Sequence, residues 1–194
     1  GSDIFYSGRS VFVPFPGKHQ TENCITALTV IDLLKEQGIA ISEKAIREGI
    51  AKTRNPARCE VVSENPLVIL DGCHNEDSAS ALCSVMEKNL KGKKIYAVMG
   101  MMADKDIDTV LALLPTKAVY YFTQPSTSRA LPAEELLSRW QSIHPLSDIR
   151  YPLSVYQTVK EALDAAQKDA SNEDIIFIGG SNYVVGEVLS QFPF

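Results

Sequence analysis

Short apolar runs alternate with amphipathic stretches along the chain from residue 59 onward. Most of these runs are apolar at four or five consecutive positions, as expected for strands that are buried on both faces of a sheet. The runs are Glu60–Val62, Leu67–Leu70, Ile95–Met99, Val119–Phe122 and Ile175–Ile178, and the amphipathic stretches cover residues 76–90, 104–114, 132–142, 156–170 and 182–191. This alternation predicts an α/β fold with three αβα layers and a doubly wound, mostly parallel sheet of about six strands.

One pair of runs breaks this order. Residues 59–62 and 67–70 are separated by only four residues, which is enough for a hairpin but not for a crossover helix. We therefore expect one antiparallel strand at the edge of the sheet. The stretch from Ile149 to Val155 contains Pro152 and has the weakest strand pattern of any expected element.

The beginning of the chain has a different pattern. Residues 10–15 predict a short strand, and two helices should follow, over about 21–38 and from 42 to the residues before Pro56. This short, mainly helical segment contains too little sheet to enclose a core. We therefore place a domain boundary in the segment Arg54–Arg58, and we set the first two residues aside as the remnant of an expression tag.

Composition and charge narrow the functional classes. The 194 residues are 45% hydrophobic and 22% charged, which is typical of a globular domain with a sizeable core. The net charge of −5 argues against binding to nucleic acid or to an anionic membrane. No apolar run approaches the ~18 residues of a spanning helix, and no secretory signal is visible. The four cysteines show no C-x-x-C spacing, so we expect reduced thiols, no metal site and a cytoplasmic protein.

Two phosphate-binding motifs are missing from the sequence. It contains neither a G-x-x-x-x-G-K-[ST] phosphate loop nor a G-x-G-x-x-G fingerprint. An enzyme of nucleotide chemistry would have to obtain that part of its site elsewhere.

Polar and small residues follow four of the expected parallel strands. Ligands of open α/β sheets bind beyond the carboxyl ends of the strands, so these loops form the candidate site. The loops are Asp71–Asn75, Gly100–Asp106, Thr123–Pro125 with the nearby Arg129, and Gly179–Tyr183.

The loop Asp71–Asn75 carries the densest chemistry. Asp71 at a strand end can accept hydrogen bonds from ribose hydroxyls, and His74 at a helix start can donate to a phosphate or a carboxylate. The alternative is that Asp71 and Asn75 only cap the helix and that His74 is exposed without a role.

The other candidates have equally simple alternatives. Ser181 belongs either to an anion-binding turn or to an ordinary helix cap. Lys105 lies among aspartates and is either a substrate contact or part of a solvated helix start. Arg58 suits phosphate binding, although a single arginine in a linker is often only solvated. Trp140 and the pair Tyr120–Tyr121 are expected to pack in the core.

Successive motifs of the chain resemble one enzyme family, the bifunctional dihydrofolate synthase/folylpolyglutamate synthases of the Mur-ligase superfamily. The matching motifs are His19–Asn23, Arg54–Arg58, Leu70–Asn75, Gly100–Asp106, Arg129–Ala130 and Gly180–Glu187. They occur in the family's order and cover nearly everything from about Phe15 onward. Their combination is therefore far more specific than any single motif.

This resemblance implies an ATP-dependent amide ligase. Such enzymes use ATP to convert a carboxylate of dihydropteroate or a folate to an acyl phosphate, which the amine of L-glutamate attacks with release of ADP and phosphate. Residues 3–57 would be the tail of a central ATPase domain, and residues 58–194 the Mur-ligase-type C-terminal domain. The phosphate loop and the Mg²⁺ ligands would lie in the absent part of the N-terminal ATPase domain. The chain would then be a fragment that is inactive alone.

The resemblance also assigns roles to individual residues. Those implied to contact the nucleotide are Asn23 near the base, Arg58 on the phosphates and Asp71 on the ribose, and those implied to face the reacting centre or the incoming glutamate are His74, Asn75, Lys105 and Ser181. The sequence departs from the family pattern at Ala57, Cys73, Glu76 and Asn182, where the family usually has Gly, Ala, Pro and an apolar residue. None of these changes removes a functional polar side chain, but Asn182 bears on the specificity for glutamate.

Two other classes fit less well. A receiver-like signalling or interaction module needs several acids after its first parallel strand and a phospho-acceptor aspartate after its third, where this chain has only Asp71 and Thr123. A nicotinamide-binding Rossmann domain needs the glycine fingerprint that is missing. The sequence leaves open whether a parent enzyme makes dihydrofolate, extends polyglutamate chains or does both.

Overall fold

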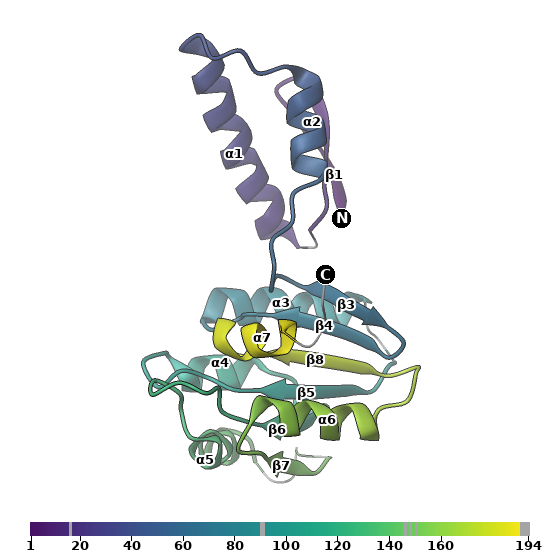
Figure 1. Ribbon diagram of the computed structural model, residues 1–194, viewed down its shortest axis with the longest axis vertical. Coiled ribbons are helices and arrows are strands. Elements are labelled where there is room, and N and C mark those ends of the chain that lie inside the picture. Colours follow the sequence, from purple (N-terminus) through teal and green to yellow (C-terminus); the bar gives the residue numbers. More distant parts are fainter. Residues whose placement is uncertain (16, 90–91, 146, 148, 150, 191–194) are drawn as a thin grey trace. The chain divides into compact units, whose positions relative to one another are not determined.

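The chain forms two compact units, Gly1–Pro56 and Ala57–Phe194. The computed structural model (Figure 1) describes all residues except 16, 90–91, 146, 148, 150 and 191–194. The division between the units falls inside the segment Arg54–Arg58. Each unit has its own hydrophobic core.

The first unit combines a β-hairpin with two helices. Strands β1 (Ser2–Tyr6) and β2 (Arg9–Val13) pair antiparallel and are followed by helices α1 (Lys18–Glu36) and α2 (Glu43–Ala51). The core residues are Val11, Val13, Cys24, Leu28 and Ile46. Arg9 of β2 links the hairpin to both helices. Its guanidinium pairs with Asp32 of α1 at 2.8 Å and with Glu43 of α2 at 3.1 Å.

The hairpin corrects two expectations for this segment. The predicted strand at residues 10–15 runs instead from Arg9 to Val13, and it pairs with β1, which includes Ser2 and was not expected. The segment therefore has more sheet than the sequence suggested. A small core of its own results.

A six-stranded sheet forms the centre of the second unit. Its strands are β3 (Glu60–Glu64), β4 (Leu67–Asp71), β5 (Ile95–Met99), β6 (Val119–Phe122), β7 (Leu153–Val155) and β8 (Ile175–Gly179), in the spatial order β3-β4-β8-β5-β6-β7. Strand β3 pairs antiparallel with β4, and all other pairs are parallel. The predicted α/β class, strand number and antiparallel edge strand are confirmed. The insertion of β8 between β4 and β5 creates the crevice position at which doubly wound sheets bind ligands.

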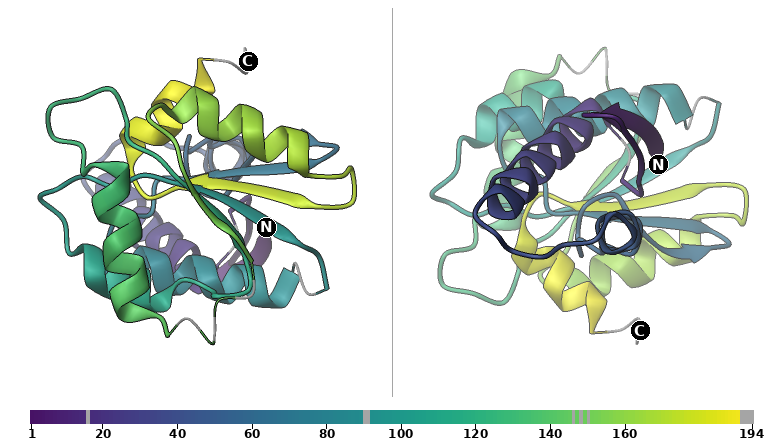
Figure 2. Two further views of the ribbon diagram at one scale, coloured as in Figure 1. Left: turned by 90° about the horizontal axis from the view of Figure 1, so that it is seen from below. Right: turned by 90° about the horizontal axis from the view of Figure 1, so that it is seen from above.

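Five helices cover the two faces of this sheet (Figure 2). On one face lie α3 (Glu76–Asn89), α4 (Ile107–Leu113) and α5 (Ala133–Ile143), and on the other lie α6 (Val159–Asp169) and α7 (Asn182–Leu189). Strand β6 packs against the helices on both faces of the sheet. Tyr120 contacts Trp140 of α5, and Tyr121 belongs to the cluster on the α6 side. Trp140 and both tyrosines are buried, so their predicted role in the core is confirmed.

Side-chain caps set where two of the predicted helices begin. The Asp106 carboxylate accepts from the backbone N–H of Thr109, so α4 starts at Ile107 and not at residue 104 as the sequence suggested. Thr158 and Glu161 form a reciprocal capping box that starts α6 at Val159, three residues after the predicted start. In the part of the chain that the structure describes, no helix combines the length and apolar character needed to cross a membrane.

Candidate functional site

Glycines allow the carboxyl ends of the central strands to meet closely. Gly180, just after β8, has φ +91°, and a Cβ there would lie 2.6 Å from the carbonyl oxygen of Gly100 after β5. The Gly100 N–H in turn donates to the Gly179 carbonyl at 3.2 Å. A Cβ at Gly72 would overlap the side-chain oxygen of Asn182. The loops after β4, β5 and β8 are therefore in direct contact because these positions lack side chains.

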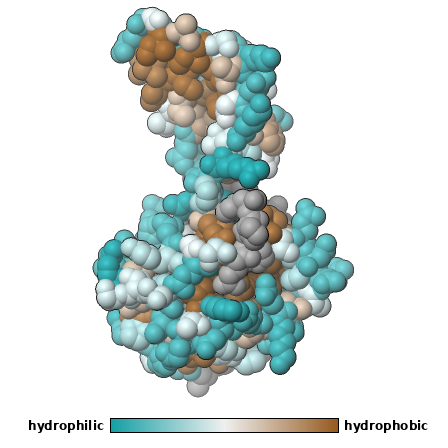
Figure 3. Space-filling view, in the orientation of Figure 1, coloured by the Kyte–Doolittle hydropathy of each residue, from teal (hydrophilic) through white to brown (hydrophobic). Residues whose placement is uncertain are grey.

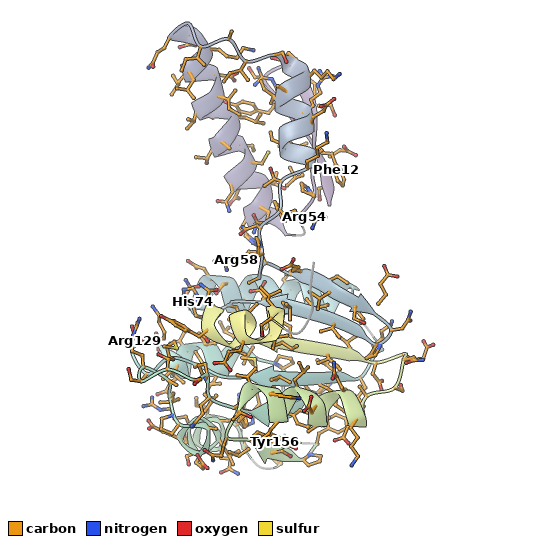
Figure 4. The ribbon with its side chains drawn as sticks, in the orientation of Figure 1. Phe12, Arg54, Arg58, His74, Arg129 and Tyr156 are labelled. Atoms are coloured by element: carbon orange, nitrogen blue, oxygen red, sulfur yellow. The ribbon has the colours of Figure 1, made fainter. Side chains whose placement is uncertain are left out.

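A cavity of about 190 Å³ lies where these loops converge. It is lined by His74 after β4, Met102 and Lys105 after β5, Arg129 after β6, and Ser181, Asn182 and Tyr183 after β8. Figure 4 shows His74 and Arg129 at this end of the sheet. The structure thus brings together His74, Lys105 and Ser181, three of the residues that the sequence singled out.

His74 has one ring nitrogen occupied and one available. Its Nδ1 lies 2.7 Å from the Gly72 carbonyl. Because a carbonyl can only accept, Nδ1 carries the proton and donates, which leaves Nε2 as the acceptor of the neutral ring. The neighbouring Asn75 accepts from the Ser78 N–H at 2.9 Å through its side-chain oxygen. Asn75 thus makes the helix-capping contact of its simpler interpretation and does not line the cavity.

Ser181 both caps a helix and lines the cavity. Its hydroxyl oxygen accepts from the Val184 N–H at 3.2 Å at the start of α7, and the residue is 1% exposed. The hydroxyl proton has no acceptor among the described residues. It is therefore available to a ligand in the cavity.

A pair of loops closes the other side of the cavity. Arg129 forms an ion pair of 2.6 Å with Asp104, and this guanidinium holds the pKa of the Asp104 carboxyl below its ordinary value. Backbone bonds join the same loops, from Ala103 N–H to the Arg129 carbonyl and from Leu131 N–H to the Met101 carbonyl. No individual role was predicted for Arg129, and its position after β6 was the available signal.

Lys105 presents an unpaired charge beside this ion pair. Its side chain is exposed and forms no ion pair or hydrogen bond within the described residues. The ammonium is therefore free for an anionic ligand.

Asp71 anchors the start of the second unit. One carboxylate oxygen, Oδ2, accepts from the Cys59 N–H at 2.9 Å and from the Cys59 thiol at 3.3 Å. The other, Oδ1, is buried and has no partner in the described part of the chain. The Gly72 N–H donates to the Ala57 carbonyl at 2.8 Å. Arg58 is thereby held beside the end of β4.

Arg58 itself is half-buried and unpaired. It lies between Ala57 at φ +62° and Cys59 at φ +46°, two unusual conformations for residues with a Cβ. No described side chain forms a hydrogen bond or an ion pair with its guanidinium. Its charge is therefore available to an anion.

The cysteines next to Asp71 are unreactive thiols. All four cysteines of the chain are free, as predicted. Burial, together with the Asp71 carboxylate, raises the pKa of Cys59 and of Cys73 to about 12. Both therefore remain protonated near neutral pH and do not supply a nucleophile.

The remaining candidate, Asn23, belongs to the first unit, where it is exposed on α1. Across the described residues, no three His, Cys, Asp or Glu side chains converge in a way that could hold a metal ion.

These features define a domain of the doubly wound α/β class, with a polar cavity at its topological switch point. A family model described as "Mur ligase, glutamate ligase domain" matches residues 57–182. The chain belongs to this family, which sets aside the receiver-like and nicotinamide-binding alternatives.

Relatives of known sequence and structure agree with this assignment. The dihydrofolate synthase/folylpolyglutamate synthase of Escherichia coli is 35% identical over 164 residues, which cover 84% of this chain and 36% of the relative. The structure of E. coli FolC in complex with DHPP and ADP superposes with a TM-score of 0.79 at 32% identity, over 95% of this chain and 42% of that one. A bifunctional folylpolyglutamate synthase/dihydrofolate synthase with Mn, AMPPNP and L-glutamate bound gives 0.75 at 29% identity, with the same coverage. The chain thus spans about two fifths of the length of these proteins.

Proposed function

We propose that this chain is the C-terminal part of an ATP-dependent acid–amino-acid ligase that adds L-glutamate to dihydropteroate or to folates. The observation that carries the proposal is the cavity at the carboxyl end of the sheet. It is lined by the imidazole of His74, the ammonium of Lys105 and the hydroxyl of Ser181. Solved relatives bound to ADP, to DHPP and to L-glutamate support it. The proposed domains are the tail of a central ATPase domain at residues 3–57 and the glutamate ligase domain at 58–194.

The nucleotide contacts proposed for the second unit are Arg58 and Asp71. The buried, unpartnered Oδ1 of Asp71 fits a hydroxyl donor such as ribose, and the unpaired guanidinium of Arg58 fits a phosphate. Asn23 is the proposed contact near the base. Bound ATP would supply the phosphoryl group that makes the substrate carboxylate reactive toward an amine.

The glutamate contacts proposed are His74, Lys105 and Ser181. Nε2 of His74 can accept a proton from the ammonium of the amino acid, because Nδ1–H is already committed to Gly72. Lys105 can pair with a carboxylate, and the Ser181 hydroxyl can donate to one. Asn75, next to His74, is proposed to position the start of α3 through its capping bond.

Mg²⁺ is proposed to be held by the N-terminal ATPase domain. The described residues of this chain offer no set of three metal ligands. That domain is the proposed partner of the chain. A cytoplasmic location is proposed because all four cysteines are free thiols.

The first test of this function compares the 194-residue chain with a longer parent protein that includes the ATPase domain. We expect the chain alone to produce no ADP in the presence of glutamate and folate, and at most to bind ATP or glutamate weakly. Glutamate-dependent ADP production by the chain alone would refute its proposed incompleteness.

The second test substitutes the site residues in that parent. Asp71→Ala and His74→Ala should each reduce ligation by orders of magnitude, since each removes a contact to a reactant. Lys105→Ala removes the proposed partner of the glutamate carboxylate and should also slow ligation. Its control is Lys117→Ala, at another exposed lysine, which should leave the rate unchanged. Near-normal ligation in both the Asp71 and His74 variants would contradict the site assignment.

A further inference from the structure

A second cavity of about 270 Å³ lies at the opposite end of the same sheet. Its lining comes from the amino ends of the strands: Lys94 precedes β5, Val119 begins β6 and Pro152 precedes β7. The helix on this face, α6, contributes its last residue, Asp169. This cavity shares no lining residue with the first one.

Hydrogen bonds with tyrosines hold the two charged groups of this cavity. The Lys94 ammonium donates to the Tyr96 hydroxyl at 2.8 Å, and that hydroxyl donates to the Asp169 backbone carbonyl at 2.9 Å. The Tyr121 hydroxyl donates to Asp169 Oδ2 at 2.7 Å. The Lys94 Nζ also lies 5.5 Å from the ring centroid of Tyr151. Both charges are thus held in place before any ligand arrives.

These opposite charges line one cavity without pairing with each other. Within the described residues, neither Lys94 nor Asp169 forms an ion pair, and the Tyr96 hydroxyl stands between them. The hydrogen bond to Tyr96 raises the pKa of Lys94, so this side chain stays charged. Asp169 ends α6, where the helix dipole adds negative potential. The cavity therefore offers one cation and one anion, and each is hydrogen-bonded to a tyrosine.

The rest of the lining is apolar or neutral. Val119, Pro152 and the ring of Tyr151 supply apolar surface, and Ser154 supplies a hydroxyl without a partner in the described chain. Among the residues that the structure describes, no second cation lines the cavity. A dianion such as a phosphate would find one cation and a repelling carboxylate, whereas a zwitterion would satisfy both charges. The volume lies below the ~300–1,000 Å³ of sites for drug-sized ligands, so the ligand must be small.

We propose that this cavity is a second binding site, which takes a free α-amino acid with an apolar or aromatic side chain. The α-carboxylate pairs with Lys94 and the α-ammonium pairs with Asp169. The side chain packs on Tyr151, Val119 and Pro152. This site is independent of the proposed ligase function, because none of its residues belongs to the cavity at the other end of the strands.

The test is a titration of the chain with L-phenylalanine, followed by amide chemical shifts. We expect saturable shifts at Lys94, Tyr151 and Ser154 and none at His74 or Ser181. Lys94→Gln and Asp169→Asn should each weaken binding roughly tenfold or more, because each removes one charged partner. The Asn variant keeps an oxygen that can accept the Tyr121 hydroxyl bond, so the fold is preserved.

Matched controls separate these charges from general surface effects. Lys93→Gln changes the adjacent exposed lysine, and Asp164→Asn changes another exposed acid of α6, so both should bind phenylalanine like the unaltered chain. 3-Phenylpropionate lacks the ammonium and phenethylamine lacks the carboxylate, so both should bind more weakly. The proposal would be overturned by an absence of saturable shifts, by shifts at His74 instead, or by equal losses in the control variants. It would also be overturned if either analogue bound as tightly as phenylalanine. Equal affinity for L-glutamate would also overturn it, because the described lining of the cavity offers no cation for a second carboxylate.

Discussion

Asp71 is a buried side chain that stabilises the fold and is also a proposed ligand contact. Its Oδ2 satisfies the Cys59 N–H, while its Oδ1 is buried without a partner among the described residues. We expect Asp71→Ala to lower the free energy of unfolding by about 1–3 kcal/mol, because the Cys59 N–H loses its acceptor. Chemical denaturation measures the change. Asp164→Ala, at an exposed acid paired with Lys160, is the control and should change stability by less than about 0.5 kcal/mol. Equal stability of the two variants would show that the bond to Cys59 contributes nothing.

The thiols beside Asp71 make stability depend on alkaline pH. Cys59 and Cys73 have a pKa of about 12 in the folded chain, compared with an ordinary value of 9.0. Between these values the unfolded chain loses the thiol protons and the folded chain keeps them, so the free energy of unfolding falls as pH rises from 9 to 12. The slope is at most about 1.4 kcal/mol per pH unit for each thiol, and less for the half-buried Cys59.

Tyrosines and lysines also titrate in this range, so the measurement must be a difference. Denaturation of the reduced chain and of the Cys59→Ala, Cys73→Ala double variant at several pH values isolates the thiols. The double variant should show the shallower decline above pH 9. Parallel curves for both proteins would contradict the assigned cause.

The location of a site residue could be predicted where the residue directly follows the end of a strand. The rule that ligands bind at carboxyl ends selected His74, Lys105 and Ser181, and these three do line one cavity. The bond from Cys59 to Asp71 and the ion pair of Arg129 with Asp104 join residues that are 12 and 25 positions apart. No local pattern encodes such contacts, because they arise only when separate loops are brought together.

At the scale of elements, strands buried on both faces were the easiest to predict. Strands β5, β6 and β8 consist of consecutive apolar residues, and their predicted and observed bounds agree within one residue. The hairpin of β1 and β2 was not predicted, although only Ser2 of β1 was set aside as part of a tag. A signal was present in Ser7-Gly8, where both residues have positive φ in a two-residue turn. The place of β8 in the middle of the sheet could not be predicted, since sequence periodicity carries no strand order.

Helix caps give a prediction that separates structure from ligand binding. Ser181 caps α7 and Thr158 caps α6, each by accepting one backbone N–H bond at 3.2 Å. Ser181→Ala and Thr158→Ala should each lower the free energy of unfolding by about 1 kcal/mol. In a longer parent enzyme, only Ser181→Ala should also raise the KM for glutamate, because Thr158 does not line the cavity. An equal change of KM in both variants would assign the effect to stability alone.

At the scale of the whole molecule, the two units differ in how well they bury apolar surface. The second unit has two large clusters of buried residues, one on each face of its sheet. The first has a single small cluster and exposes large apolar side chains at Phe5, Val30, Leu33 and Ile39. Figure 3 shows a hydrophobic patch on the surface of this unit. Domains of about 60 residues are marginally stable even when their core is complete.

We therefore expect the first unit to open more readily than the second. Hydrogen exchange followed by mass spectrometry should show faster exchange in α1 and α2 than in β5 and β8, whose residues are buried at the centre of the sheet. Val98→Ala in β5 should accelerate exchange throughout the second unit and leave α1 and α2 unchanged, since Val98 belongs to a core that the first unit does not share. Leu28→Ala should do the reverse, because Leu28 is fully buried in the core of the first unit. If either substitution accelerated exchange in both units equally, the chain would unfold as one cooperative body, and the division into two independent cores would be wrong.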